Sequence, residues 1–231
     1  MDISAIGISD FESKKYEPSA FFEVTGEFLR EKPNTVAKMI YNAIDWLRIG
    51  EWVSQENKIA NDVHFHAKCF KNIHTGPLGI VKQWEKIHSA GRQVFSSSQL
   101  SDLGEFSLCC NNIMGAIYDS VALWSTAVRE IPKGMMMNLN KCCGVAVIIS
   151  KICEIWRIKN AGPLDGRQKF LDLGNHISYL VIGVLLVSSA FFGAIVPGWL
   201  LTLCTTSTIV FSTLGYYYKN FDKLNDSASC C

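Results

Sequence analysis

The feature that most constrains this chain is a long uncharged stretch near its C-terminus. The 46 residues 173–218 contain no Asp, Glu, Lys or Arg, and Pro197 and Gly198 divide the stretch once. An α-helix rises about 1.5 Å per residue, so roughly 20 apolar residues cross a hydrocarbon core of about 30 Å. Residues 177–196 and 198–218 each have that length. The pattern predicts a transmembrane hairpin that turns at Pro197 and Gly198.

The two halves of the hairpin differ in composition. The first contains 12 Leu, Ile, Val or Phe residues, whereas the second contains 7 of these and 7 Ser or Thr. Hydroxyl groups in the second half can bond to carbonyls of the preceding turn or to the first helix. Small residues four apart allow two helices to approach closely. We expect such contacts at Ser189, Gly193, Thr208 and Ser212. A buried hairpin inside a soluble helical core is the alternative.

Charged residues flank the uncharged stretch on both sides. Arg167 and Lys169 precede it, and Lys219 and Lys223 follow it. The loop between the halves is too short to hold a domain, so both ends should face the same side, and the positive-inside tendency predicts that both termini are cytosolic. We expect residues 216–218, three tyrosines, to form an interfacial belt, followed by a cytosolic tail at 219–231.

Upstream of the hairpin, apolar residues recur with helical spacing. The pattern predicts a helix that opens at Pro33, a second that stops at Thr75, and a third from Leu78. A longer helix should end before Pro132, and the next should end before Gly162. No alternation typical of strands persists. The predicted fold is all-α: a flexible N-terminus at 1–18, a cytosol-facing helical domain at 19–160, a linker and pre-membrane segment at 161–176, and the hairpin.

The predicted helix at 135–158 has two interpretations. Its apolar centre, Cys142–Ser150, lies between Lys141 and Lys151 and is too short to span a bilayer. This segment is either part of the core of the helical domain or a helix in the membrane surface whose lysines reach outward.

Charge argues against nucleic acid as a partner, because the net charge of the chain is only +1. A basic stretch within 58–92 nevertheless suggests a surface for anionic lipid or for an acidic protein. Mutual neutralisation or a solvated face is the alternative. The candidate residues of this stretch are Lys58, Lys68, Lys71, Lys82, Lys86 and Arg92.

Nine cysteines are present, and six of them form three adjacent pairs. Neighbouring cysteines rarely bond each other, and the opening residues Met1-Asp2-Ile3-Ser4 do not resemble a cleaved apolar signal. We therefore expect reduced thiols that face a cytosol. The terminal pair, Cys230 and Cys231, is either a lipidation site or two ordinary cysteines.

No pattern in the chain predicts catalysis, a cofactor or a metal. His66 and Cys69 share one face of a helix, whereas His64 points away and His74 lies out of reach. Two ligands do not make a zinc site, which needs four, or three and a water. A Cys69 nucleophile with His66 as its base is the enzymatic alternative, which we weigh below a non-enzymatic role.

In its layout the chain resembles the chlamydial inclusion membrane proteins. The two hydrophobic lobes, "ISYLVIGVLLVSSAFFGAIV" and "PGWLLTLCTTSTIVFSTLGYYY", carry this resemblance, together with the polar N-terminus "MDISAIGISDFES". The resemblance implies a type III secreted effector in the inclusion membrane, with a helical part that faces the host cytosol, a host–pathogen interaction and a role in virulence. Many members of that family have the hairpin early, whereas here it is nearly terminal.

The layout also resembles, more weakly, the peroxisome-elongating peroxin family. There, amphipathic helices precede apolar C-terminal segments and remodel the membrane. The segments at 34–56, 135–158 and 177–218 would take these parts. The resulting hypothesis is a membrane-anchored interaction protein that recruits a protein partner at its cytosolic face. Membrane shaping in an organelle such as the peroxisome is the alternative, and a homo-oligomer stays open.

Overall fold

The protein is all-α. The computed structural model describes residues 18–81, 84, 86, 100–127, 132–160 and 165–228, and these contain no strand. The helices are α1 (Pro18–Glu31), α2 (Pro33–Ile49), α3 (Lys58–Thr75), α5 (Leu100–Ala127), α6 (Lys133–Asn160), α7 (Gly166–Phe192) and α8 (Gly198–Ala228). Residues 77–81 are also helical. The expected flexible segment at 1–18 lies outside the described residues, apart from Pro18.

Local sequence signals explain several helix ends. Pro33 stands at the first position of α2, where its missing N–H costs nothing, and Gly50 caps the other end, so α2 stops well before residue 56. Asn57 caps α3, because its side-chain oxygen accepts a hydrogen bond from the backbone N–H of Ala60 at 3.0 Å. Gly76 follows the last residue of α3.

The hairpin is longer at its base and shorter at its tip than the sequence predicts. Asp165 caps α7 by accepting from the backbone N–H of Arg167, so the helix occupies most of the predicted linker at 161–176. At the other end Gly193 adopts a left-handed conformation with φ of 65° and ends α7 before residue 196. Residues 193–197 form the turn, so Pro197 is its last residue and Gly198 begins α8.

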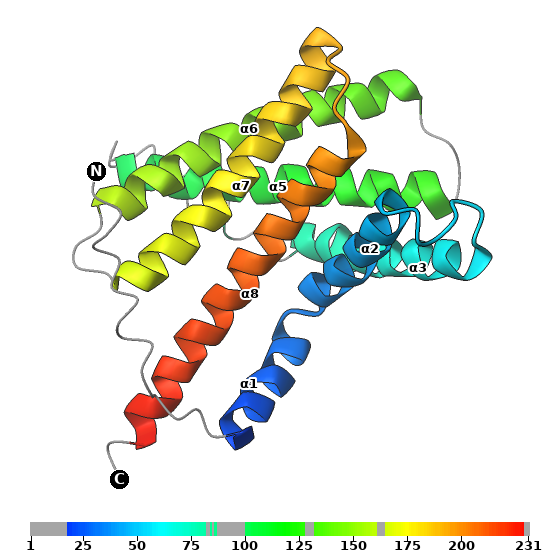
Figure 1. Cartoon of the computed structure of the whole chain (residues 1–231). Helices are drawn as coiled ribbons and strands as arrows, with labels where there is room; N and C mark the ends of the chain where they lie inside the picture. Colours follow the sequence, from blue (N-terminus) through cyan, green and yellow to red (C-terminus); the bar gives the residue numbers. More distant parts are fainter. Residues whose placement is uncertain are drawn as a thin grey trace.

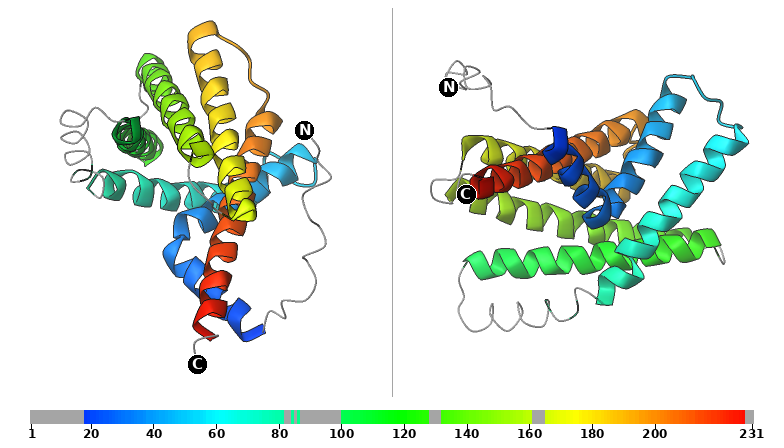
Figure 2. Two further views of the ribbon diagram at one scale, coloured as in Figure 1. Left: turned by 90° about the vertical axis from the view of Figure 1, so that its left-hand side faces the viewer. Right: turned by 90° about the horizontal axis from the view of Figure 1, so that it is seen from below.

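The described helices contact one another in a closed ring. Going round it, α2 touches α3, α3 touches α5, α5 touches α6, α6 touches α7, α7 touches α8, and α8 touches α2 again. Helix α1 packs outside the ring against α8 and α2. Figure 1 shows α7 and α8 side by side, with the end of α7 reaching beyond the first turn of α8 and an extended loop joining them. In the right-hand view of Figure 2, α3 closes the side between α2 and α5. The hairpin is therefore part of the helical body.

Helix α7 approaches α6 and α8 closely at glycines, and these glycines are not the small residues expected from the sequence. A Cβ on Gly144 of α6 would lie 3.3 Å from the backbone oxygen of Gly183 of α7, and a Cβ on Gly174 would lie 2.6 Å from the Phe211 ring of α8. These glycines let α7 approach both neighbours.

Among the four residues expected at the hairpin contact, three are exposed: Ser189, Gly193 and Ser212. A Cβ on Gly193 would meet no atom within 4 Å, because this residue lies past the end of α7. Thr208 is buried, as expected of a contact residue.

Candidate functional site

Inside the ring, charged and polar side chains from several helices meet. The Lys71 ammonium of α3 lies 2.5 Å from a carboxylate oxygen of Asp119 on α5, and the Thr75 hydroxyl donates to the other oxygen at 2.5 Å. Burial lowers the pKa of Lys71, and the Asp119 carboxylate partly offsets this. An ion pair this enclosed needs its hydrogen bonds to balance the cost of removing both charges from water.

Two further lysines, one from α2 and one from α6, approach the Tyr179 side chain of α7. Lys38 of α2 donates to the Tyr179 hydroxyl at 3.4 Å, and the Lys151 ammonium of α6 lies 5.2 Å from the centroid of the Tyr179 aromatic ring. Lys151 is 8 % exposed, and burial lowers its pKa. Glu154, one turn further along α6, is buried and accepts a hydrogen bond from Arg157. Tyr179 is thus the point at which α2, α6 and α7 share a polar contact.

Helix α2 is joined to α8 mainly through hydroxyl groups. The Asn42 amide donates to the backbone oxygen of Thr202 at 3.2 Å, and the Thr206 hydroxyl donates to the Asn42 side-chain oxygen at 2.8 Å. The indole N–H of Trp46 donates to the Thr206 hydroxyl at 2.7 Å. Asn42 and Thr202 are buried. We call these four residues the polar latch.

The outer surface of the ring has the opposite character on α6, α7 and α8. Each of these helices exposes a stripe of large apolar side chains at helical spacing. On α7, for example, Ile177, Val181 and Val184 are between 39 % and 48 % exposed. We call these three stripes together the outer apolar face. Its members are Val145, Ile149, Ile152 and Trp156 of α6, Ile177, Val181 and Val184 of α7, and Leu203, Val210 and Leu214 of α8.

The stripes on α6 and α7 face the same side of the molecule. Lys141 lies over the Phe191 ring and Lys151 over that of Tyr179, so the two helices run antiparallel. On each helix a stripe residue directly follows the glycine that touches the other helix: Val145 follows Gly144 on α6, and Val184 follows Gly183 on α7. One residue corresponds to a rotation of about 100° around the helix axis, so each stripe is turned by this angle from the contact, in the same sense. In antiparallel neighbours this turns both stripes to one side. Lys151 points inward and does not interrupt the outer apolar face.

The tip of the hairpin exposes the most apolar surface. Phe192 is 83 % exposed and Ile195 is 96 % exposed, and Phe191 and Trp199 beside them are about half exposed. Large apolar side chains gathered on the surface of a protein mark a site that contacts a membrane or a partner. Both α7 and α8 are long and apolar enough to cross a membrane, and little of either is buried within the molecule.

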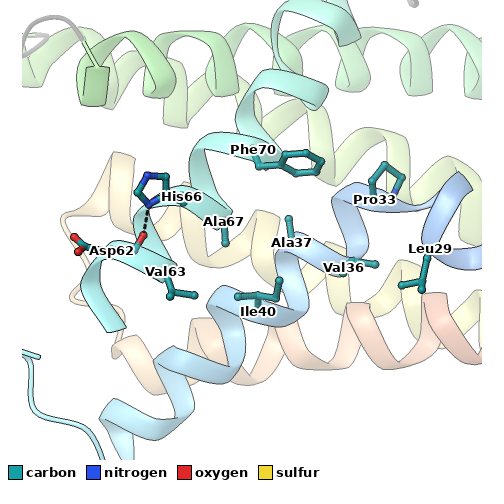
Figure 3. Close-up of a pocket in the computed structure, with 10 residues that line it drawn as sticks. All are labelled: Leu29, Pro33, Val36, Ala37, Ile40, Asp62, Val63, His66, Ala67 and Phe70. Atoms are coloured by element: carbon teal, nitrogen blue, oxygen red, sulfur yellow. Dashed lines mark hydrogen bonds between the residues drawn. The ribbon is translucent and has the colours of Figure 1, made fainter. Parts of the chain in front are cut away.

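A second apolar site is a groove between α1, α2 and α3 (Figure 3). Its volume is about 600 Å³. Val36 and Ile40 of α2 face Val63 and Phe70 of α3 across it, and Asp62 and His66 stand at one side. The groove is lined by Leu29, Pro33, Val36, Ala37, Ile40, Asp62, Val63, His66, Ala67 and Phe70. Concave, mainly apolar sites of this size suit an apolar ligand or side chains of a partner helix.

The described lysines of the predicted basic stretch differ in their exposure. Lys71 points inward to Asp119, so it does not belong to an open basic surface. Lys58, Lys68 and Lys86 are exposed, and the Lys68 ammonium lies 5.7 Å from the centroid of the Tyr41 ring. Lys82 and Arg92 lie outside the described residues, as do Cys230 and Cys231.

The residues considered for metal binding or catalysis make other contacts. The Nδ1 atom of His66 lies 2.7 Å from the backbone oxygen of Asp62 on its own helix. His64 pairs with Asp45 at 3.0 Å. In the part of the chain that the structure describes, no three His, Cys, Asp or Glu side chains cluster as metal ligands would. Burial raises the pKa of the Cys143 thiol to about 11, which keeps it protonated at neutral pH.

Comparison with known proteins adds no relative. No family model, curated protein or solved structure matches this chain.

Proposed function

We propose that this chain is a non-enzymatic membrane protein that is anchored through α7 and α8 and recruits a protein partner with its remaining helices. The outer apolar face carries this proposal. Three neighbouring helices direct large apolar side chains away from a polar ring interior, and two highly exposed apolar residues, Phe192 and Ile195, lie at the hairpin tip. In water such a surface favours aggregation, whereas among acyl chains each of these side chains favours insertion.

The contact between α2 and α8 sets a condition on how deeply the hairpin inserts. Sixteen residues separate Thr202 from Tyr218, which corresponds to about 24 Å along α8. A fully spanning hairpin that kept the polar latch would therefore carry α2, with Asp45 and Arg48, deep into the membrane. Charges at that depth cost several kcal/mol each. We infer that the structure is a closed form and that full insertion separates α2 from α8.

Helix α8 can lose the polar latch without leaving the hydroxyls of Thr202 and Thr206 unbonded. Thr202 donates to the backbone oxygen of Gly198 at 3.1 Å, Thr206 to that of Thr202 at 2.8 Å, and Ser207 to that of Leu203 at 3.0 Å. Every one of these bonds stays within α8. Because these hydroxyls have acceptors within α8, the helix tolerates a lipid environment that the seven Ser and Thr residues of 198–218 would otherwise oppose.

The apolar groove is the surface that we assign to partner recruitment. It lies on α1, α2 and α3, away from the outer apolar face. An amphipathic helix of a partner would place apolar side chains between Ile40 and Phe70, with Asp62 and His66 at the rim. On the resemblance to inclusion membrane proteins, the membrane is that of a pathogen vacuole and the partner is a host protein.

Two measurements test this function. Carbonate extraction followed by protease protection should find the protein in the membrane fraction with both termini accessible from the cytosol. Proximity labelling from the same protein should identify neighbours that are lost in Val63→Asp. The matched control is Ile59→Asp, which changes an exposed residue one turn earlier on α3 that does not line the groove. Release by carbonate would contradict anchoring, and identical neighbours in both variants would contradict the role of the groove.

A membrane-shaping function is the second candidate, and the α6 stripe favours it. A helix that lies in the membrane surface beside an inserted hairpin would expand one leaflet and bend the bilayer. Purified protein should then convert spherical liposomes into tubules, and Ile149→Asp should abolish this. Liposomes that stay spherical at high protein density would rule this candidate out.

A further inference from the structure

A polar pocket opens at the base of the hairpin, on the opposite end from its tip. Its volume is about 400 Å³, and it lies where the junction of α1 and α2 meets the first turns of α7 and residues 211–220 of α8. The residues that matter here are Glu31, Lys32, Gln168, Asp172, Asn175 and Lys219. Two carboxylates and two ammonium groups therefore border one small pocket.

Two residues that line the pocket carry hydrogen-bond acceptors that lack a donor. Gln168 donates through its Nε2 atom to Asp172 at 2.8 Å, which fixes the orientation of the amide, and its Oε1 atom is then buried without a partner. The side-chain oxygen of Asn175 is likewise buried and unpartnered. Glu31 accepts one hydrogen bond, from the Tyr216 hydroxyl at 2.9 Å. Buried unpaired acceptors are costly, so a ligand that donates several hydrogen bonds would relieve them.

The pocket also coincides with the edge of the uncharged stretch. Asp172 is the last charged residue before it and Lys219 the first after it. If the hairpin enters a membrane as proposed above, this level is the interface where lipid headgroups lie. Lys32 and Lys219 are exposed at the rim and can approach a phosphate, whereas the amide and carboxylate oxygens suit a cation.

We propose that this pocket binds the headgroup of an aminophospholipid, in which a phosphate is esterified to an alcohol that carries a primary amine. The ammonium group carries three N–H donors, which match Asn175, Gln168 and the Asp172 carboxylate. A quaternary choline has the same charge but no N–H donor, so it leaves the two amide oxygens unpaired. The inference rests on the proposed membrane anchoring, since it is the membrane that brings a lipid headgroup to this level.

The test uses the full-length protein in detergent, titrated with dihexanoyl-phosphatidylethanolamine, with dihexanoyl-phosphatidylcholine and with soluble phosphoethanolamine, each followed by calorimetry. The ethanolamine lipid should bind roughly tenfold more tightly than the choline lipid. Asp172→Asn should weaken both lipids, because both headgroups carry a cation, while the neutral side chain still bonds Gln168. Lys219→Gln should weaken both lipids equally. Glu56→Gln, in an exposed loop, is the matched control and should change neither affinity.

Equal affinity for the two lipids would overturn the proposal, and so would an Asp172→Asn protein of unchanged helix content that binds both lipids as tightly as before. Phosphoethanolamine that binds as tightly as the lipid would assign the site to a free small molecule instead. Carbonate extraction of the same variants separates the two claims. A protein that resists extraction yet shows no headgroup preference keeps its anchoring and loses only this site.

Discussion

The Thr206 hydroxyl of α8 lies 2.8 Å from the Asn42 side-chain oxygen of α2, and this bond links the predicted membrane hairpin to the helical part. The same hydroxyl lies 2.8 Å from the backbone oxygen of Thr202. It has one proton to donate, so it can serve either α2 or its own helix at a given moment. The Thr206 hydroxyl can therefore bond Asn42 in the closed form, and we expect it to bond only Thr202 in the proposed inserted form.

The polar latch should stabilise the closed form measurably. Asn42→Ala leaves the Thr206 hydroxyl without its acceptor on α2, and we expect the free energy of unfolding to fall by about 1–3 kcal/mol. Thr206→Val should cost a similar amount, and the double variant should cost less than the sum of both. Thermal unfolding of the detergent-purified protein measures this. Ser207→Ala, which changes a neighbouring exposed hydroxyl, is the control, and fully additive losses would show that the two residues do not interact.

The ion pair inside the ring gives a second prediction. Lys71→Met leaves Asp119 buried with only the Thr75 hydroxyl as a described side-chain partner, and should reduce the free energy of unfolding by about 3–5 kcal/mol. Lys71→Met combined with Asp119→Leu should recover most of that loss. Denaturant titrations of the native protein and of both variants decide this. A double variant as unstable as Lys71→Met alone would mean that packing, and not the unpaired charge, causes the loss.

Close packing between α6 and α7 depends on Gly144 and Gly183. A Cβ on Gly144 would lie 2.8 Å from a methyl carbon of Val187, so Gly144→Leu should separate the helices and lower the melting temperature. Overpacking of this kind typically costs about 1–3 kcal/mol. Gly134→Leu, on the same helix but in open space, should be tolerated. Equal melting temperatures for the two variants would contradict the observed contact.

The fold shows which parts of this molecule a sequence can predict. Helices α2, α3, α5 and α6 follow from apolar spacing and from Pro and Gly breaks, because these signals are local. The ring closure does not, since Lys71 and Asp119 are 48 residues apart and their pairing depends on how α3 and α5 dock. Lys151 illustrates the limit. It looks like the end of an apolar segment in the sequence, whereas it points to Tyr179 inside the ring.

Acidification should destabilise the protein through His64. Burial, together with nearby Lys68, lowers the pKa of His64 below its ordinary value of 6.5 in spite of Asp45. As the pH falls through 6.5, the unfolded chain therefore takes up a proton before the folded protein does, and the free energy of unfolding decreases. His64→Gln should flatten this dependence between pH 7 and 5. Parallel melting curves for both proteins across that range would show that His64 is not responsible.

The outer apolar face offers a way to separate a membrane protein from a soluble bundle. Val184 is 48 % exposed, so a soluble bundle would accept Val184→Lys without loss. In a membrane, a lysine near the helix centre costs roughly 2.5–3.5 kcal/mol of insertion. We expect the variant to shift from the carbonate-resistant fraction to the soluble one. Gln55→Lys, in an exposed loop, is the control.

The most direct test of the account concerns Trp199, which is 52 % exposed at the hairpin tip. In a variant that keeps this as its single tryptophan, reconstituted into vesicles, lipids brominated on their acyl chains should quench its fluorescence strongly, and aqueous iodide should not. Quenching by iodide with no effect of the brominated lipids would place the hairpin in water and contradict the proposed anchoring.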